Sequence, residues 1–303
     1  MKTKITIFTA LIYNLFIAAN AQVTEGESKL KSVTTDTISG WKKGGTTSFN
    51  LAQTALTNWS AGGESSFALN GSLGLFANYK DSTTVWDNSL EAGYGLLKQG
   101  TTGLRKTDDR LEINSKYGKK AFSNFYYAAL INFKTQFAPG YNYTVNKKIS
   151  NFLAPGYLIG AIGLNYQPNS YFSAFLAPFT GRLTIVKDTT FSNYGAFGVD
   201  PGKSLRMEFG GYARILFNKQ DFKGELLKNV SLTSKLDLFT NYLKDPQNVD
   251  VSWENIIFMK VNKYIVISLN TNIVYDADVK DPVDNVAKVQ FKEILGVGFA
   301  YKF

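Results

Sequence analysis

The chain contains no cysteine and no histidine. Without cysteine there are no disulfides, no thiolate nucleophiles and no cysteine-built metal sites. Without histidine the chain lacks the usual general base near neutral pH and the commonest metal ligand. A Ser-His triad or an Asp-His pair is therefore excluded. A Ser-Lys arrangement stays open, but no spacing in the sequence selects such a pair, so we expect neither an enzyme nor a cofactor.

Long hydrophobic runs are also absent, except for one at the N-terminus. Lys2 and Lys4 flank the start of an apolar run that ends at Ala19, and Ala19-Asn20-Ala21 supplies a small-x-small pattern. This combination predicts a signal peptide at residues 1–21. A single membrane anchor would need a longer run of about 20 residues and no cleavage pattern. No later run reaches that length, so we do not expect a helical membrane protein.

The segment that follows, residues 22–44, is polar and without a sustained period, and we expect a flexible periplasmic lead-in. The formal charge is +9, and removing Lys2 and Lys4 with the predicted signal peptide leaves +7. The basic residues are scattered rather than clustered in a stripe, so no nucleic-acid partner is expected. The expected partners of this surface are outer-membrane lipid and lipopolysaccharide, although a plain solubility surplus explains the charge as well.

From residue 45 onward, apolar and polar residues alternate with unusual persistence, which is typical of β-strands. The pattern is weaker at 46–57, 108–118, 152–166 and 170–187. It predicts twelve strands, at residues 46–57, 66–80, 86–96, 108–118, 125–137, 152–166, 170–187, 205–217, 230–242, 249–261, 265–275 and 292–303. Most of these reach the length of about 9 to 11 residues that a transmembrane strand needs.

The lengths of the connections decide between a soluble sandwich and a membrane barrel. The predicted gaps 81–83, 118–121, 167–169 and 262–263 are short, with 218–226 as the exception, whereas 98–107, 138–151, 188–203 and 277–287 are longer. Short turns at one end and long loops at the other are the signature of outer-membrane barrels. We therefore predict an all-β fold for residues 45–303: a transmembrane, antiparallel, up-and-down β-barrel of about 12 strands.

The last residues fit this fold. Val297, Phe299, Tyr301 and Phe303 alternate with small or polar residues, so the closing strand ends on an aromatic residue. Outer-membrane proteins resemble one another in such an ending, which the bacterial barrel-insertion machinery recognises. We expect that machinery to be a partner of the C-terminal strand and the outer membrane to be the location of the protein.

Three segments are similar to a known family. They are Asn58–Gly63 (NWSAGG), Ala177–Gly181 (APFTG) and Gly195–Gly202 (GAFGVDPG). They resemble the DUF3078 family of Bacteroidetes, over most of the chain that follows the predicted signal peptide. That family is uncharacterised, so the resemblance implies a setting in the cell envelope and no activity, and no functional residues can be carried over from it.

Two sets of residues are candidates for binding. The first is a row of charges on the polar faces of neighbouring predicted strands, which would line the lumen: Arg206, Glu208, Arg214, Lys235 and Asp237. These charges either neutralise each other in a wet interior or form a selectivity constriction. The second set is the loop carboxylates Asp276, Asp278, Asp281 and Asp284. Counted from Asp276, an EF-hand would need Gly at 281 and Glu at 287, so that motif fails and a loose divalent site or a solvated loop remains.

The polar, charged inner faces favour a narrow channel or transporter for small polar solutes. The alternative is a closed structural or assembly barrel that binds other envelope proteins. Bulky residues expected to point inward favour this alternative: Phe76, Tyr126, Tyr166, Tyr212 and Phe239. The segment Gly195–Gly202 is predicted to form a shaped turn. The sequence does not decide whether this turn folds into the lumen as a partial plug.

Overall fold

The structure is a computed structural model that describes residues 39–57, 60–61, 63–219, 222–224, 227–262, 265–280 and 286–302. The predicted signal peptide, and the lead-in up to residue 38, lie outside the described residues. Within the described residues, no helix is both long enough and apolar enough to cross a membrane.

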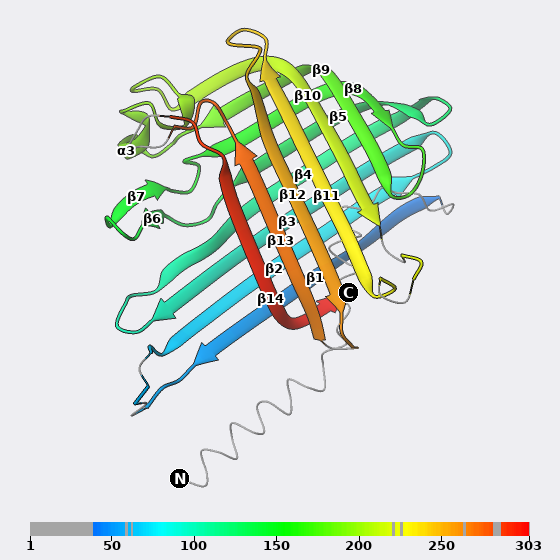
Figure 1. The fold of residues 1–303 in the computed structure, drawn as a ribbon. Coiled ribbons are helices and arrows are strands. Elements are labelled where there is room, and N and C mark those ends of the chain that lie inside the picture. Colours follow the sequence, from blue (N-terminus) through cyan, green and yellow to red (C-terminus); the bar gives the residue numbers. More distant parts are fainter. Residues whose placement is uncertain are drawn as a thin grey trace.

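Twelve antiparallel strands form a closed barrel (Figure 1). They are β1 (Gly40–Thr54), β2 (Ser66–Lys80), β3 (Thr84–Gln99), β4 (Arg105–Phe122), β5 (Phe125–Thr135), β8 (Gly156–Tyr166), β9 (Phe172–Ile185), β10 (Leu205–Lys219), β11 (Val230–Asn241), β12 (Val249–Lys260), β13 (Ile265–Tyr275) and β14 (Gln290–Lys302). Each strand pairs with its neighbours in chain order, and β1 pairs with β14. The predicted all-β barrel of twelve strands is confirmed.

Several predicted strand boundaries differ from the structure by a few residues, and two of these differences change how the chain is divided. β1 begins at Gly40, so the predicted border between lead-in and barrel, after residue 44, falls inside a strand. β4 continues to Phe122, so the predicted turn at 118–121 is part of the strand and the chain reverses at Ser123 and Asn124. Ser123 adopts a φ of 46°, the left-handed conformation that so tight a reversal uses.

The connections differ in length at the two ends of the barrel. At one end, here called the short-turn end, they span 81–83, 123–124, 167–171, 220–229 and 261–264. At the other, the long-loop end, they span 55–65, 100–104, 136–155, 186–204, 242–248 and 276–289. The long loops carry the hairpin of β6 (Gly140–Asn142) and β7 (Lys147–Ser150), helix α3 (Thr189–Ser192) and the 3-10 turn η1 (Ala196–Gly198), all of which project to the left in Figure 1.

The barrel is polar inside and apolar outside, the inverse of a soluble protein. In β10, Met207 is 81% exposed on the outer face, whereas its neighbour Glu208 is 2% exposed on the inner face. The same alternation runs through β11, where Thr233, Lys235 and Asp237 are buried in the lumen. An apolar outer surface around a polar interior is the arrangement that a hydrocarbon environment requires.

A β-bulge in β9 explains why the alternation of residues 170–187 is weak in the sequence. Ala177 is buried on the inner face, and after the bulge Thr180 is the next buried residue, so the inward positions change from odd to even numbers. Both neighbouring strands shift register at this point. Pro178 lies in the bulge, where its missing N–H costs no ladder hydrogen bond.

Gly163 of β8 lies against this bulge, where the backbone of β9 leaves no room for a side chain. A Cβ at this position would stand 1.9 Å from the carbonyl oxygen of Leu176, which is backbone and cannot rotate away. We expect Gly163→Ala to lower the free energy of unfolding by about 1–3 kcal/mol, as overpacking does. Gly160→Ala in the same strand is the control, because nothing lies within 4 Å of its Cβ position. Urea unfolding in lipid vesicles measures both, and equal stability of the two variants would contradict the predicted clash.

Candidate functional site: the charged lumen

The first group of lumen charges lies towards the long-loop end. Arg182 of β9 donates to both carboxylate oxygens of Glu208 at 2.7 and 2.9 Å, and it also pairs with Asp250. Arg206 contacts the same Glu208 at 2.9 Å and Asp278 at 2.6 Å. We call these residues the upper network. The predicted lumen residues Arg206 and Glu208 thus contact each other. Arg182, which was not among the predicted residues, lies at the centre of the network.

The second group, the middle network, holds the other three predicted residues. Arg214 donates to Asp237 at 2.6 Å, and the Tyr212 hydroxyl donates to the same carboxylate at 2.7 Å. Lys235 pairs with Glu112 at 3.1 Å and with Glu254 at 3.3 Å. Each predicted charge therefore has an opposite charge in contact, as the neutralising interpretation expects.

Several of these pairs join opposite walls of the barrel. Arg110 on β4 contacts Glu254 on β12 at 3.0 Å, and these two strands are six places apart in the ring of twelve. Lys235 on β11 and Glu112 on β4 are five places apart. A pair between opposite strands can form only where the lumen is no wider than two side chains. The ion pairs therefore bridge the lumen at this level.

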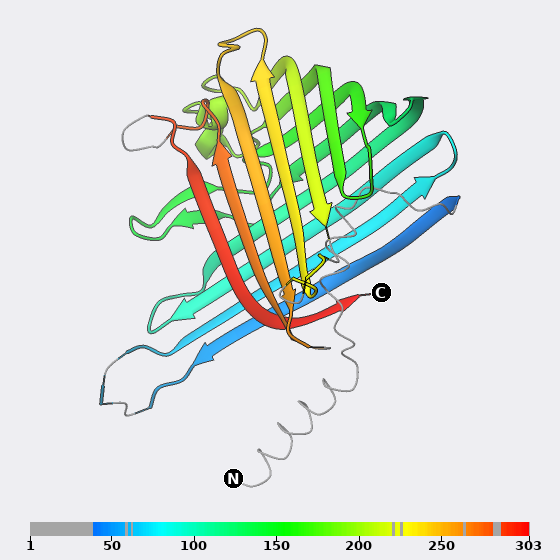
Figure 2. The same cartoon turned by 45° about the vertical axis from the view of Figure 1, so that its right-hand side comes forward.

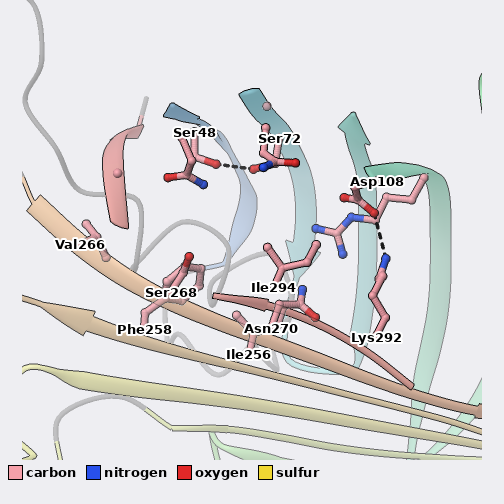
Figure 3. Close-up of a pocket in the computed structure, with 15 residues that line it drawn as sticks. Ser48, Ser72, Asp108, Ile256, Phe258, Val266, Ser268, Asn270, Lys292 and Ile294 are labelled. Atoms are coloured by element: carbon pink, nitrogen blue, oxygen red, sulfur yellow. Dashed lines mark hydrogen bonds and ion pairs between the residues drawn. The ribbon is translucent and has the colours of Figure 1, made fainter. Parts of the chain in front are cut away.

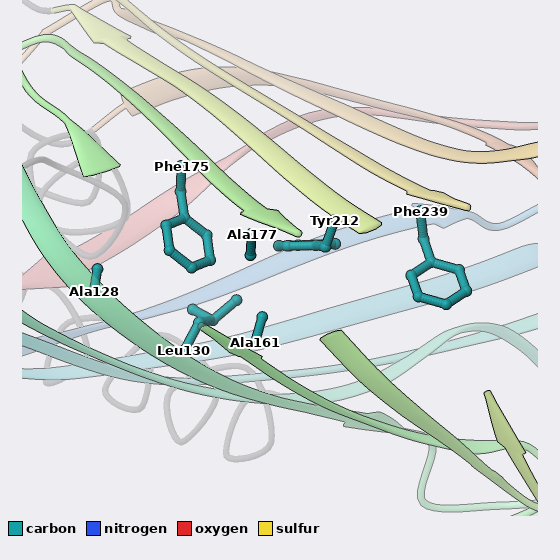
Figure 4. Packing of buried hydrophobic residues seen from close by; sticks show 7 residues of the cluster. All are labelled: Ala128, Leu130, Ala161, Phe175, Ala177, Tyr212 and Phe239. Carbon is teal, nitrogen blue, oxygen red and sulfur yellow. The ribbon is translucent and has the colours of Figure 1, made fainter. Parts of the chain in front are cut away.

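An apolar layer fills another part of the interior. It consists of Ala128, Leu130, Ala161, Phe175, Ala177, Tyr212 and Phe239, all buried and pointing inward (Figure 4). Ala128 and Phe175 lie near the starts of β5 and β9, close to the short-turn end. Of the aromatic residues predicted to face inward, Tyr212 and Phe239 belong to this layer. Phe76 and Tyr126 also lie on the inner faces of their strands, at the even-numbered positions that are buried in β2 and β5.

The predicted inward position of Tyr166 is wrong. Ala161 and Asn165 are the buried inner residues of β8, so Tyr166 shares the outer face with Ile162 and Leu164. Its ring lies 4.8 Å from that of Phe125, centroid to centroid.

The lumen contains a cavity of about 550 Å³, which we call the vestibule, and residues of both charge networks and of the apolar layer line it. Residues of the long loops, among them Ile149, Pro155 and Phe197, line one end of it. Five basic side chains, those of Arg110, Lys134, Arg182, Lys235 and Lys292, balance five acidic ones, those of Glu112, Asp237, Asp250, Glu254 and Asp276. The lining also includes the side-chain oxygens of Asn132 and Asn272, two buried acceptors that have no hydrogen-bond partner among the described residues.

Phe197 belongs to the segment Gly195–Gly202, which the sequence allows either to plug the lumen in part or to stay outside it. This residue has a φ of 58° and packs with Phe191, at 5.9 Å between ring centroids, in an apolar cluster with Ala154 and Val186. The segment thus packs against the other long loops, and Phe197 lines the vestibule.

The predicted loop carboxylates are divided. Asp276 and Asp278 lie near Arg182, at 3.9 and 3.8 Å, and Asp278 also holds Arg206, so arginines are their partners. Asp281 and Asp284 lie outside the described residues. In the part of the chain that the structure describes, no cluster of three or more acidic side chains is arranged to hold a metal ion.

Asp276 is expected to make the stability of the barrel depend on pH. Burial, followed by the negative charge of Asp250, raises the pKa of Asp276 to about 6 from its ordinary value of 3.8, against the opposing effect of Arg182. A raised folded-state pKa gives stability that is present at low pH and is lost as the pH rises through about 6. Wild type should therefore lose about 2 kcal/mol relative to Asp276→Asn between pH 4.5 and pH 7.5. Urea unfolding at both pH values tests this, and parallel pH profiles of the two proteins would contradict it.

Comparison with known proteins adds a partial family match. The family model described as "Protein of unknown function (DUF3078)" matches residues 51–141. Of the three segments that resemble that family, only Asn58–Gly63 lies within the match, which covers less than half of the chain. A Bacteroidetes origin stays a prediction. No curated protein matches the chain.

Solved structures align with most of this chain at low identity. The COG4313 outer membrane channel from Pseudomonas putida F1 aligns with 10% identity and a TM-score of 0.41, covering 90% of this chain and 98% of that one. The translocator domain of autotransporter NalP from Neisseria meningitidis aligns with 10% identity and a TM-score of 0.36, covering 93% of each chain. The beta domain of the Bordetella autotransporter BrkA aligns with 10% identity and a TM-score of 0.30, covering 84% of this chain and 98% of that one. All three TM-scores are below 0.5, so the barrel rests on the strand pairing of this chain and not on these alignments.

Proposed function

We propose that this chain is an outer-membrane barrel that acts as a narrow, gated channel or transporter for small polar solutes. The vestibule accepts a solute from the long-loop end, and the ion pairs of the middle network close the path below it. Equal numbers of basic and acidic side chains give the vestibule no net charge, so it favours an uncharged solute with hydrogen-bond donors for Asn132 and Asn272. No catalytic role is proposed.

One observation carries this proposal. The contact between Arg110 and Glu254 joins opposite walls, so the lumen is closed by groups that can separate without unfolding a strand. A barrel closed only by packed apolar side chains would have to repack before it could open. Ion pairs across a wet lumen exchange partners at lower cost, because water and neighbouring charges can replace each contact.

The second candidate is a closed structural or assembly barrel that binds other envelope proteins. The apolar layer around Phe175 and Leu130 favours it, because both side chains are almost fully buried in the lumen. In either case we propose that lipid and lipopolysaccharide contact the outer surface, that a signal peptide directs export, and that the insertion machinery binds the C-terminal strand.

Conductance of the refolded barrel in a planar bilayer tests the proposal. Folding is first established by heat-modifiable gel mobility. The gated channel predicts brief, infrequent openings of wild type, because the bridging pairs are formed most of the time. Steady openings of a large pore would contradict the gate, and a barrel that stays silent even when the bridge is removed would favour the structural candidate.

A further inference from the structure

The seam between the first and last strands is much shorter than the other strand pairings. β1 and β14 pair only from Thr46–Lys302 to Phe49–Phe299, whereas β1 pairs with β2 along all of its length. Beyond Phe49, no pairing across the seam is found among the described residues, although β1 continues to Thr54 and β14 begins at Gln290. β14 diverges from β1 over most of its length (Figure 2). The wall therefore has an unpaired stretch, here called the slot, between residues 50–54 of β1 and 290–298 of β14, on the side of the long-loop end.

Asn50 and two glycines mark the point where the strands separate. The side chain of Asn50 lies against β14, where a Cβ on Gly298 would stand 1.7 Å from its Oδ1 atom and one on Gly296 would stand 3.4 Å from its Nδ2 atom. Glycine in a strand interior permits a bend and a close approach of this kind. The polar side chain thus occupies the place where the next cross-strand contact would form.

A cavity of about 80 Å³ lies inside the barrel at this seam (Figure 3). Ile256, Phe258 and Val266 form a buried apolar cluster in its lining, on inner faces that are otherwise polar. The opposite side of the lining is polar, with Ser48 and Ser72 at 2.6 Å and the pair of Lys292 and Asp108 at 2.8 Å. The cavity is therefore amphiphilic.

The outer surface beside the slot is strongly apolar. Phe49, Leu295 and Val297 are each more than 60% exposed on it, as expected for side chains in contact with lipid. Unpaired strand edges are not tolerated against hydrocarbon unless polar groups or water reach them. Whatever fills the slot must therefore carry both a hydrocarbon part and a polar part.

We propose that the seam is a lateral portal that takes a membrane amphiphile with one acyl chain and an anionic head group. The end of the chain contacts Ile256, Phe258 and Val266, and the head group lies near Lys292, whose side chain is 44% exposed. The cavity is too small for a whole lipid, so the head group and the first part of the chain lie in the slot, where the polar head group and its water reach the unpaired strand edges. This inference goes beyond the proposed axial path and does not rest on it, because the portal opens through the wall.

Cysteine pairs test the slot directly, since the native chain has no cysteine. The double variant Phe49→Cys/Phe299→Cys places thiols at a paired position of the seam, and Leu51→Cys/Val297→Cys places them two residues further along the same edges. Mild oxidation should form a disulfide in the first pair and not in the second, because a disulfide needs Cα atoms within about 7 Å. Efficient bonding in both pairs would show a closed wall and overturn the portal.

Photoreactive palmitate carrying a diazirine near its methyl end tests the ligand. In proteoliposomes we expect it to label inward-facing residues of β12 and β13, including Phe258, and we expect Lys292→Gln to reduce that labelling several-fold. Labelling by the matching photoreactive hexadecanol should not respond to Lys292→Gln, and Lys43→Gln, at an exposed lysine of β1, should change neither. Labelling confined to outward residues such as Leu295 would mean ordinary lipid contact and would overturn the proposal.

Discussion

Replacing Arg110 and Glu254 together by alanine should change brief openings into steady conduction. The two side chains reach from opposite walls and meet at 3.0 Å. Because both are removed together, no unpaired charge from this pair remains. Lys235 still contacts Glu112, so the middle network keeps a carboxylate for it. The cross-section widens by the volume of both side chains, at the level where the lumen is bridged.

The matched control removes an ion pair that lies on one wall. Asp87 and Lys116 lie on the neighbouring strands β3 and β4 and approach to 3.9 Å without crossing the lumen. Asp87→Ala/Lys116→Ala should leave conductance at the wild-type level. In the opened background, Arg214→Ala should shift the ion preference towards cations, because Asp237 then lacks its arginine. An Arg110→Ala/Glu254→Ala barrel that is folded but silent would place the closure in the apolar layer around Phe175.

The alternation of the sequence predicted the barrel because one side chain in two faces lipid along each strand, whatever the partner strand is. The same rule placed Arg214, Lys235 and Asp237 on inward positions, since β10 and β11 alternate without interruption around them. Arg182 was missed because the bulge at Pro178 reverses the phase of β9 before it. A proline within a strand is a signal of such a bulge and could have corrected the phase.

The bridging of the lumen could not be predicted in this way. Arg110 and Glu254 are 144 residues apart, and their contact depends on the order of the strands around the ring. Local patterning fixes the face on which a side chain lies and carries no information about its partner across the lumen. Whether the lumen is open or bridged therefore follows only from the three-dimensional arrangement of the strands.

Asp237→Asn should be among the most destabilising single substitutions in the lumen. Within the described residues, Asp237 is the carboxylate that Arg214 contacts, at 2.6 Å, and both side chains are largely buried. Loss of one partner leaves a buried charge uncompensated, which typically costs about 3–5 kcal/mol. The expected result is a marked fall in the urea midpoint of unfolding in vesicles, while Asp200→Asn, at an exposed loop position, stays within about 0.5 kcal/mol of wild type.

A double variant separates the lost ion pair from lost packing. In Arg214→Leu/Asp237→Leu both charges are gone, so most of the stability should return, because apolar replacements of a buried pair are often neutral or stabilising. If the double variant is as unstable as Asp237→Asn, the hydrogen bond from Tyr212 to Asp237, rather than the arginine, determines the effect. If both variants match wild type, the lumen is wet enough for water to solvate the free arginine. The middle network would then hold the lumen closed only weakly, which is what an easily opened gate requires.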